Sequence, residues 1–181
     1  KEKLLQILKI EGLTEKNKLH VIPSPSLNVA LITSVGSAAY ADFCDELLNS
    51  NFSFNVFARD TRMQGEGSAF DIEEGLQIVT SYQPDVIAII RGGGSTSDLL
   101  SFDSESLARA IANSSIPIFT GIGHEIDRSV ADIVAHTSYK TPTACAIGLV
   151  KTVDEFIEKI LGIKTNIINL SHNKISLDQS N

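Results

Sequence analysis

An arginine and a run of glycines follow directly on an apolar stretch of this chain. The stretch 85–90 reads Asp-Val-Ile-Ala-Ile-Ile, and the residues after it are Arg91, Gly92, Gly93, Gly94 and Ser95. Because consecutive glycines lose much backbone freedom on folding, they indicate that something comes close to the main chain. Backbone N–H groups at a helix start and a bidentate guanidinium both suit phosphate oxygens. We expect an anion site here; the alternative is a tight connection whose glycines only let a helix pack closely on a sheet.

A histidine and an aspartate lie three residues apart in a second candidate segment. The sequence Gly-His-Glu-Ile-Asp places His124 and Asp127 shortly after the apolar stretch 116–120. A histidine oriented by a carboxylate can transfer protons in catalysis. The alternative is structural, with His124 capping the next helix and Asp127 serving as a first-turn acid that the helix dipole favours. Asp42 follows an earlier predicted strand and either points at the same edge or is solvated on a helix.

The elements that must position these residues alternate between strand and helix patterns. Strands are predicted at 28–33, 52–57, 85–90 and 116–120, with helical stretches between them. This alternation predicts an α/β fold, with a doubly wound and mostly parallel sheet that carries helices on both faces. Ligands in such folds bind beyond the carboxyl ends of the strands. We therefore expect the candidate residues to converge at one edge of the sheet.

A long helix with an apolar seam is predicted at the end of the chain. Apolar residues recur three and four apart, namely Leu149, Val153, Phe156, Ile160, Ile163, Ile167 and Leu170. Such a heptad pattern predicts packing against a partner helix or a second copy of the chain. The expected organisation is a linker with a short helix at 1–25, left from a missing N-terminal domain, an α/β catalytic domain at 26–148 and a helical arm at 149–181.

The overall charge limits the way in which this chain could contact a polyanion. Fifteen Lys and Arg residues stand against 22 Asp and Glu, which gives a formal net charge of -7. An acidic balance argues against a surface that coats nucleic acid indiscriminately, so any such contact must be local.

Cys44 and Cys145 have no metal-ligand spacing, and we expect buried free thiols in a reducing, cytoplasmic setting. No apolar run is long enough to cross a bilayer, and no membrane partner is expected.

Several motifs occur together in an order that resembles the catalytic domain of the exonuclease VII large-subunit family. They are Ala38-Ala-Tyr-Ala-Asp42, Met63-Gln64-Gly65, the segment 85–95, Gly123-His-Glu-Ile-Asp127 and Thr141-Pro142-Thr143-Ala144. The combination is more specific than any one motif. The resemblance implies hydrolysis of single-stranded DNA from both ends. It also implies an OB-fold domain that is absent here, and a helical arm that binds a small subunit.

The resemblance also assigns roles to single residues. It implies four catalytic residues, Asp42, Arg91, His124 and Asp127. It implies substrate binding by Gly92, Gly93, Gly94, Ser95, Gln64 and Thr141. Many members carry an acid and an arginine where this chain has the Ala-His-Thr-Ser segment 135–138, so the role of His136 stays open.

Two questions of chemistry accompany the resemblance. Since Asp42 and Asp127 are the main carboxylates in the set, we expect no tightly bound metal and at most Mg²⁺ during catalysis.

Two other function classes remain as alternatives. One is a nucleotide- or phosphosugar-binding enzyme of kinase type. The other is an assembly module in which the heptad helix is the functional part.

Overall fold

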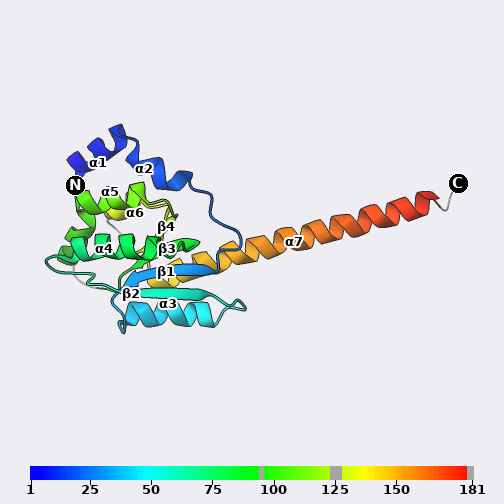
Figure 1. Ribbon diagram of the computed structural model, residues 1–181, viewed down its shortest axis with the longest axis horizontal. Coiled ribbons are helices and arrows are strands. Elements are labelled where there is room, and N and C mark those ends of the chain that lie inside the picture. Colours follow the sequence, from blue (N-terminus) through cyan, green and yellow to red (C-terminus); the bar gives the residue numbers. More distant parts are fainter. Residues whose placement is uncertain (94–95, 123–127, 179–181) are drawn as a thin grey trace.

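A five-stranded parallel sheet forms the centre of the protein (Figure 1). The computed structural model describes residues 1–93, 96–122 and 128–178, with side chains for 1–93, 99–122 and 128–170. The strands are β1 (Asn28–Thr33), β2 (Asn55–Asp60), β3 (Val86–Ile90), β4 (Ile118–Gly121) and β5 (Thr137–Ser138). They pair in the order β2-β1-β3-β4-β5, and every pairing is parallel.

Helices cover both faces of this sheet. They are α1 (Glu2–Ile10), α2 (Leu13–Lys16), the 3₁₀ helix η1 (Asn17–Leu19), α3 (Ala38–Leu48), α4 (Ser68–Thr80), the 3₁₀ helix η2 (Thr96–Asp103), α5 (Glu105–Asn113), α6 (Val130–Val134) and α7 (Pro142–Asp178). Helices α4, α5 and α6 lie on one side of the sheet, and α3 and the start of α7 lie on the other (Figure 1). The predicted doubly wound α/β fold with a long C-terminal helix is confirmed.

The two cores follow from the alternation of side chains along the strands. In β1, Ala30 and Ile32 face the core built with α4 and α5, whereas Val29 and Leu31 face the core built with α3 and α7. All five residues of β3 are buried. Successive side chains of a strand point to opposite faces, so a strand that is covered on both faces must be apolar throughout. The continuous apolar runs in the sequence are the consequence.

The second strand begins three residues later than the sequence predicts. The alternation of Phe52, Phe54 and Val56 predicts a strand at 52–57, but β2 spans Asn55–Asp60. The register is set by pairing with β1, in which Asn28 lies opposite Asn55. Phe52 and Phe54 instead contact each other edge to face, with ring centroids 6.5 Å apart. As an edge strand with no fully buried residue, β2 carries little apolar signal of its own.

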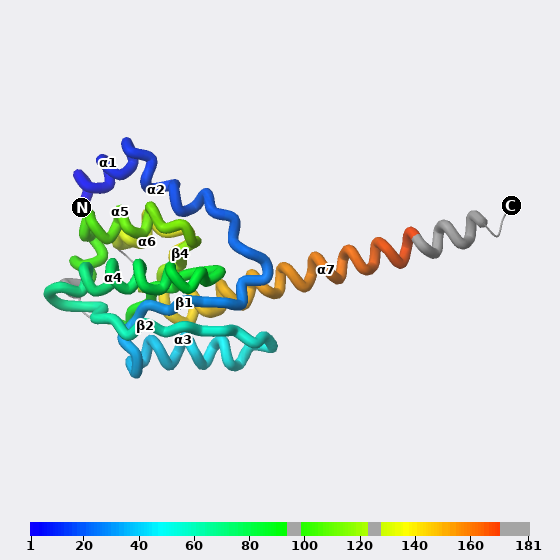
Figure 2. The backbone as a smooth tube through the Cα atoms, viewed as in Figure 1, coloured from blue at the N-terminus to red at the C-terminus, as the bar shows by residue number. Residues whose placement is uncertain are grey.

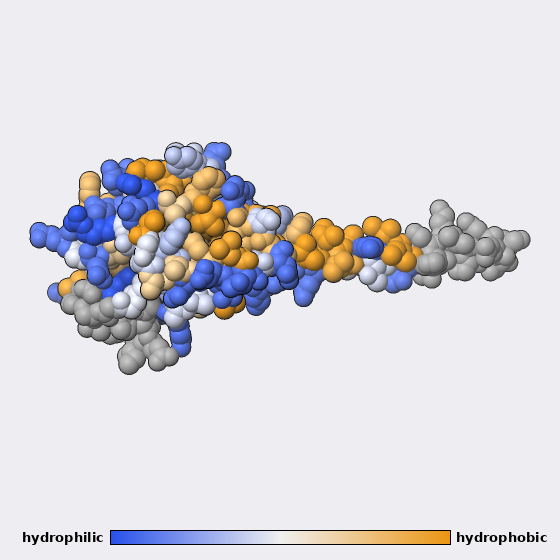
Figure 3. Space-filling view, turned by 90° about the horizontal axis from the view of Figure 1, so that it is seen from below, coloured by the Kyte–Doolittle hydropathy of each residue, from blue (hydrophilic) through white to orange (hydrophobic). Residues whose placement is uncertain are grey.

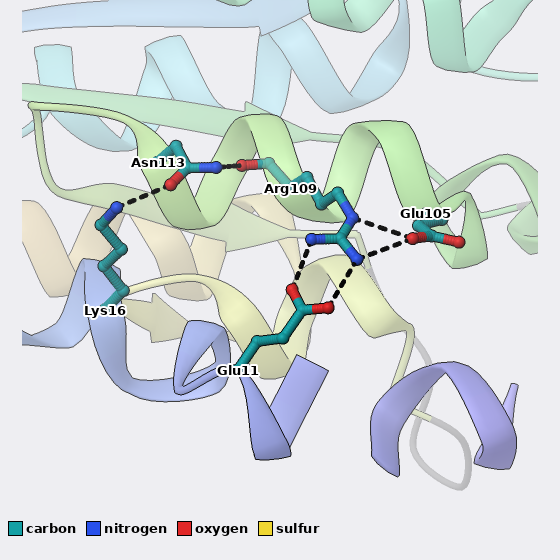
Figure 4. A network of polar contacts seen from close by, with 5 residues as sticks. All are labelled: Glu11, Lys16, Glu105, Arg109 and Asn113. Atoms are coloured by element: carbon teal, nitrogen blue, oxygen red, sulfur yellow. Dashed lines mark hydrogen bonds and ion pairs between the residues drawn. The ribbon is translucent and has the colours of Figure 1, made fainter. Parts of the chain in front are cut away.

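The N-terminal residues pack against the α/β domain. Leu8 is fully buried in the core beside α5, and a network of polar contacts lies outside it (Figure 4). In this network the Arg109 guanidinium binds both Glu11, at 2.5 and 3.0 Å, and Glu105, at 2.8 Å. Lys16 Nζ donates to Asn113 Oδ1 at 2.7 Å. Residues 1–25 therefore contain helices that are fixed to α5.

Helix α7 begins inside the domain and then leaves it as an extended arm (Figures 1 and 2). Leu149 is fully buried and Val153 is 3% exposed, so the first turns of α7 belong to the core beneath the sheet. Further along, Ile160, Ile163 and Leu170 are 48, 56 and 69% exposed. Apolar side chains gather along one side of the arm (Figure 3). The predicted apolar seam is thus divided between the core and the projecting helix.

Two more expectations concern the cysteines and the membrane. Cys44 and Cys145 are both free thiols, as predicted, but only Cys145 is buried, whereas Cys44 on α3 is half-buried. Burial raises the pKa of the Cys145 thiol well above its ordinary value, which keeps it protonated and unreactive. In the part of the chain that the structure describes, no helix has the length and apolar character to span a membrane.

Candidate active site

The strand order reverses between β1 and β3, and a pocket lies at the carboxyl ends of these two strands. The chain passes from β1 to β2 on one side and from β3 to β4 on the other, so the loops that follow β1 and β3 separate. Ligands of open α/β sheets bind at such a switch point. The pocket has a volume of about 340 Å³. Its lining includes Thr33, Ser34, Ser37, Arg62, Gln64 and Arg91.

Arg91 is the buried cation of this pocket. It follows β3 directly, its side chain is 3% exposed, and its backbone N–H donates to the Gly121 carbonyl at 3.2 Å. Gly92 and Gly93 line the same pocket. A Cβ on Gly92 would touch Ala39 at 3.4 Å, whereas a Cβ on Gly93 would meet no atom within 4 Å. The absence of side chains therefore leaves the backbone beside the arginine open to a ligand.

The other predicted site residues lie in different places. Gln64 lines the pocket. Asp42 is exposed on α3, one turn after the pocket residue Ala38, and does not line the pocket. Thr141 caps α7, where its Oγ1 accepts a hydrogen bond from the Ala144 N–H at 3.0 Å. Gly94, Ser95, His124 and Asp127 lie outside the described residues.

Arg62 is a pocket residue that the sequence prediction missed. It lies in the loop between β2 and α4 and lines the pocket together with Arg91. Its Nη1 donates to the Glu66 carbonyl at 3.0 Å, and its Nε lies 3.6 Å from Asp71 Oδ2. The predicted strand ended at residue 57, too early to bring Arg62 to the sheet edge. With the true end at Asp60, its position two residues beyond the strand would have indicated the site.

One buried carboxylate, that of Asp132, links described residues on either side of the segment at positions 123–127. Before the segment, Thr120 Oγ1 donates to Asp132 Oδ1 at 2.6 Å. After it, the Ser129 N–H and hydroxyl donate to Asp132 Oδ2 at 3.0 and 2.7 Å. Thr120 is fully buried and Ser129 is 2% exposed. The carboxylate therefore ties the end of β4 to the first turn of α6.

His136 lies at the opposite end of the sheet from the pocket. Its backbone N–H donates to the Ile118 carbonyl at 2.9 Å, where β4 begins and the strands present their amino ends. Its Nε2 lies 3.1 Å from the His20 carbonyl, and its Nδ1 lies 2.8 Å from Thr137 Oγ1. His136 thus holds the segment before β1 against the sheet, which is a structural role.

A larger hollow lies beside α3, but its composition does not suit an anion. It measures about 610 Å³ and is lined by Tyr40, Cys44, Phe52, Phe54 and other uncharged residues. In the part of the chain that the structure describes, the pocket at the switch point is lined by two guanidinium groups and no carboxylate. Among the described residues no group of three His, Cys, Asp or Glu side chains could hold a metal ion. The switch-point pocket is therefore the candidate site for a phosphate.

Comparisons with known proteins agree with this arrangement. A family profile described as "Exonuclease VII, large subunit" matches residues 13–181. The chain is 37% identical over 169 residues to the exodeoxyribonuclease 7 large subunit of Geobacter metallireducens, covering 93% of this chain and 36% of the relative. The corresponding protein of Yersinia pseudotuberculosis serotype O:3 is 38% identical over 162 residues, covering 89% of this chain and 35% of the relative.

A third relative gives the same result. The exodeoxyribonuclease 7 large subunit of Rhodopirellula baltica is 35% identical over 173 residues, covering 92% of this chain and 39% of the relative. The chain thus spans little more than a third of the length of these relatives. The profile match extends over most of the chain and includes the residues that line the switch-point pocket. The chain belongs to the exonuclease VII large-subunit family.

Proposed function

We propose that this chain is the catalytic module of an exonuclease that hydrolyses phosphodiester bonds of single-stranded DNA from both ends. The observation that carries the proposal is the position of Arg91. A guanidinium that is 3% exposed lines a pocket at the switch point of the sheet, and none of the described residues that line this pocket carries a carboxylate. Arginine binds phosphate oxygens bidentately. Membership of the exonuclease VII family supports DNA as that partner.

The proposed reaction assigns one task to each residue. Arg91 and the backbone N–H groups of the glycine loop bind the non-bridging phosphate oxygens and neutralise the charge that develops on them. Water attacks phosphorus, and the bond from phosphorus to the leaving sugar oxygen breaks. His124 either accepts a proton from the attacking water as a general base or donates a proton to the leaving oxygen as a general acid. Asp127 orients the imidazole. Asp42, exposed on α3 one turn from the pocket lining, positions the water from outside the pocket, while Gln64, Thr141 and Ser95 contact the strand.

No resident metal is part of this proposal. The described residues do not fit a metal site, because no three potential ligands cluster among them. Mg²⁺ is proposed only as an ion that accompanies the DNA during turnover, and no step of the reaction depends on it here. Adding a chelator to the assay measures that contribution directly.

The arm is proposed as the attachment site of partner chains. Its exposed apolar side chains, among them Ile160 and Ile163, form one side of a helix that projects from the domain (Figure 3). A helix with a broad apolar face is stable in water only when that face is covered. The proposed partners are the small subunit of the enzyme and, in its absence, a second copy of the chain.

The test uses the intact protein with its partner subunits and end-labelled DNA, single-stranded or duplex, with and without chelator. We expect degradation of single strands and little attack on the duplex. His124→Ala should abolish most hydrolysis while DNA binding is retained. Arg91→Lys should lower kcat by about 100-fold, because lysine cannot replace a bidentate donor.

The matched control is Arg109→Lys, since Arg109 pairs with Glu11 and Glu105 and does not line the pocket. This variant should cleave at the parent rate. A His124→Ala protein that cleaves like the parent would contradict the proposed chemistry. It would instead favour the assembly-module alternative. Binding of nucleotides but not of single-stranded DNA would favour the kinase-type alternative.

A further inference from the structure

We infer that the switch-point pocket is a subsite for a phosphate monoester, held jointly by Arg62 and Arg91, in which the enzyme retains the terminal nucleotide whose phosphate was the scissile phosphodiester before hydrolysis. The inference rests on the proposed function and adds to it a residue and a ligand. The scissile phosphodiester carries one negative charge, whereas a terminal phosphate carries about -1.5 to -2 at neutral pH. The guanidinium of Arg62 supplies the positive charge that balances this additional negative charge.

The electrostatics of the pocket support this ligand. The chain has a net charge of -7, yet the described residues that line this pocket include two guanidinium groups and no carboxylate. Arg91 comes from the end of β3 and is 3% exposed. Arg62 comes from the loop after β2, and its side chain is 61% exposed. One cation therefore lies in the interior of the site and the other on its solvent side, as needed to hold an anion between them.

The Arg62 side chain is oriented before any ligand binds. Its contacts with the Glu66 carbonyl and with Asp71 engage Nη1 and Nε. Asp71 does not line the pocket, so its charge does not occupy the anion position. A guanidinium that is already held in place loses less conformational entropy on binding a phosphate.

Polar groups on the α3 side of the pocket indicate the same ligand. Thr33 ends β1, is 1% exposed and lines the pocket. Its hydroxyl is buried and has no hydrogen-bond partner among the residues that the structure describes. The 11-residue helix α3 begins beside it, and its first residues, Ala38 and Ala39, line the pocket as well. The first N–H groups of a helix have no partner within the helix and favour anions.

The size of the pocket limits the ligand to one nucleotide. Its volume of about 340 Å³ is at the lower end of the range of roughly 300 to 1,000 Å³ found for small-molecule sites. A run of nucleotides would have to extend outside it. A subsite of this kind recognises a strand end, and it also binds deoxynucleoside monophosphates, which should act as competitive inhibitors of hydrolysis.

The experiment measures binding of three probes to the intact protein by isothermal titration calorimetry. Thymidine monophosphate carries a phosphate monoester, thymidylyl-thymidine carries only a phosphodiester, and thymidine carries no phosphate. We expect the monophosphate to bind most tightly and thymidine not to bind. Arg62→Gln should weaken binding of the monophosphate by about tenfold or more, which is the loss of one charge-assisted contact.

The matched control is Arg59→Gln. Arg59 is half-buried on β2 and pairs with an acid of α4, Glu74, at 3.7 Å, but it does not line the pocket. This variant should bind the monophosphate like the parent. Circular dichroism of both variants checks that the fold is unchanged.

Each outcome separates this inference from the proposed function. Equal binding of thymidine and its monophosphate, or parent-like binding by Arg62→Gln, would overturn the subsite. Cleavage of single-stranded DNA by a parent protein that does not bind the monophosphate would overturn the subsite alone. Binding of the monophosphate without any cleavage would support the subsite and overturn the proposed nuclease.

Discussion

The hydroxyl of Thr120 donates to Asp132 Oδ1 at 2.6 Å, and both residues are buried where β4 ends. The hydrogen bond joins a strand to a helix across the segment that contains His124 and Asp127. The second oxygen of Asp132 accepts from Ser129. The carboxylate is therefore satisfied only while the end of β4 and the start of α6 keep their positions.

Removing the Thr120 hydroxyl should destabilise the protein. Thr120→Val keeps the shape but leaves a buried carboxylate oxygen without its donor, at a cost of about 1 to 3 kcal/mol. Thr120→Ser keeps the donor and loses a methyl group, which should cost about 1 kcal/mol. Urea denaturation of both variants measures the difference. A valine variant as stable as the serine variant would show that the hydrogen bond contributes nothing.

Gly148 should not tolerate even an alanine. It lies in the buried part of α7, and a Cβ there would overlap the hydroxyl of Tyr139. Burial raises the pKa of Tyr139 to about 12, consistent with a half-buried phenol that packs against the core. We expect Gly148→Ala to lower the free energy of unfolding by on the order of 3 kcal/mol.

Gly162 provides the matched control for this substitution within the same helix. It lies in the exposed part of α7, and a Cβ there would meet no atom within 4 Å. Gly162→Ala should increase helix stability by up to about 1 kcal/mol, because alanine has the higher helix propensity. Thermal unfolding followed by circular dichroism compares the two. Similar effects at both glycines would contradict the role of Tyr139.

His136 should make stability depend on pH. Burial lowers the pKa of His136 below its ordinary value of 6.5; the hydrogen bond to the His20 backbone opposes this shift, and the charges of His20 and Lys18 add to it. Between the lowered pKa and 6.5, the unfolded chain therefore binds more protons than the folded one. The contribution of His136 to the free energy of unfolding is complete above pH 6.5 and decreases as the pH falls below 6.5. As the pH is lowered through this range, the urea concentration at the midpoint of unfolding should decrease less for His136→Gln than for the parent.

The apolar side of the arm should drive association. Ile160 and Ile163 are 48 and 56% exposed on α7. We expect the protein to self-associate when the proposed small subunit is absent, and replacement of both isoleucines by lysine to shift it towards monomers. Analytical ultracentrifugation measures the change, and Glu158→Lys, at an exposed position on the other side of the helix from Ile160 and Ile163, provides the control. A parent protein that is monomeric at high concentration would contradict the prediction.

The sequence by itself determined the central strands and the residue that follows them. The strands β1 and β3 are continuous apolar runs because both of their faces are covered, and that pattern is visible without any neighbour. The position of Arg91 at the carboxyl end of β3 follows from the end of its run. The parallel, doubly wound arrangement follows from the strand and helix alternation.

Only the tertiary structure decided which distant residues meet. The start of β2 depends on its pairing with β1, and the pocket position of Arg62 depends on that start. His136 lies beside the His20 carbonyl, 116 residues away in sequence, at the end of the sheet remote from the pocket. Local periodicity reports how each segment is buried, whereas strand register and helix docking are set by long-range contacts that no local pattern contains.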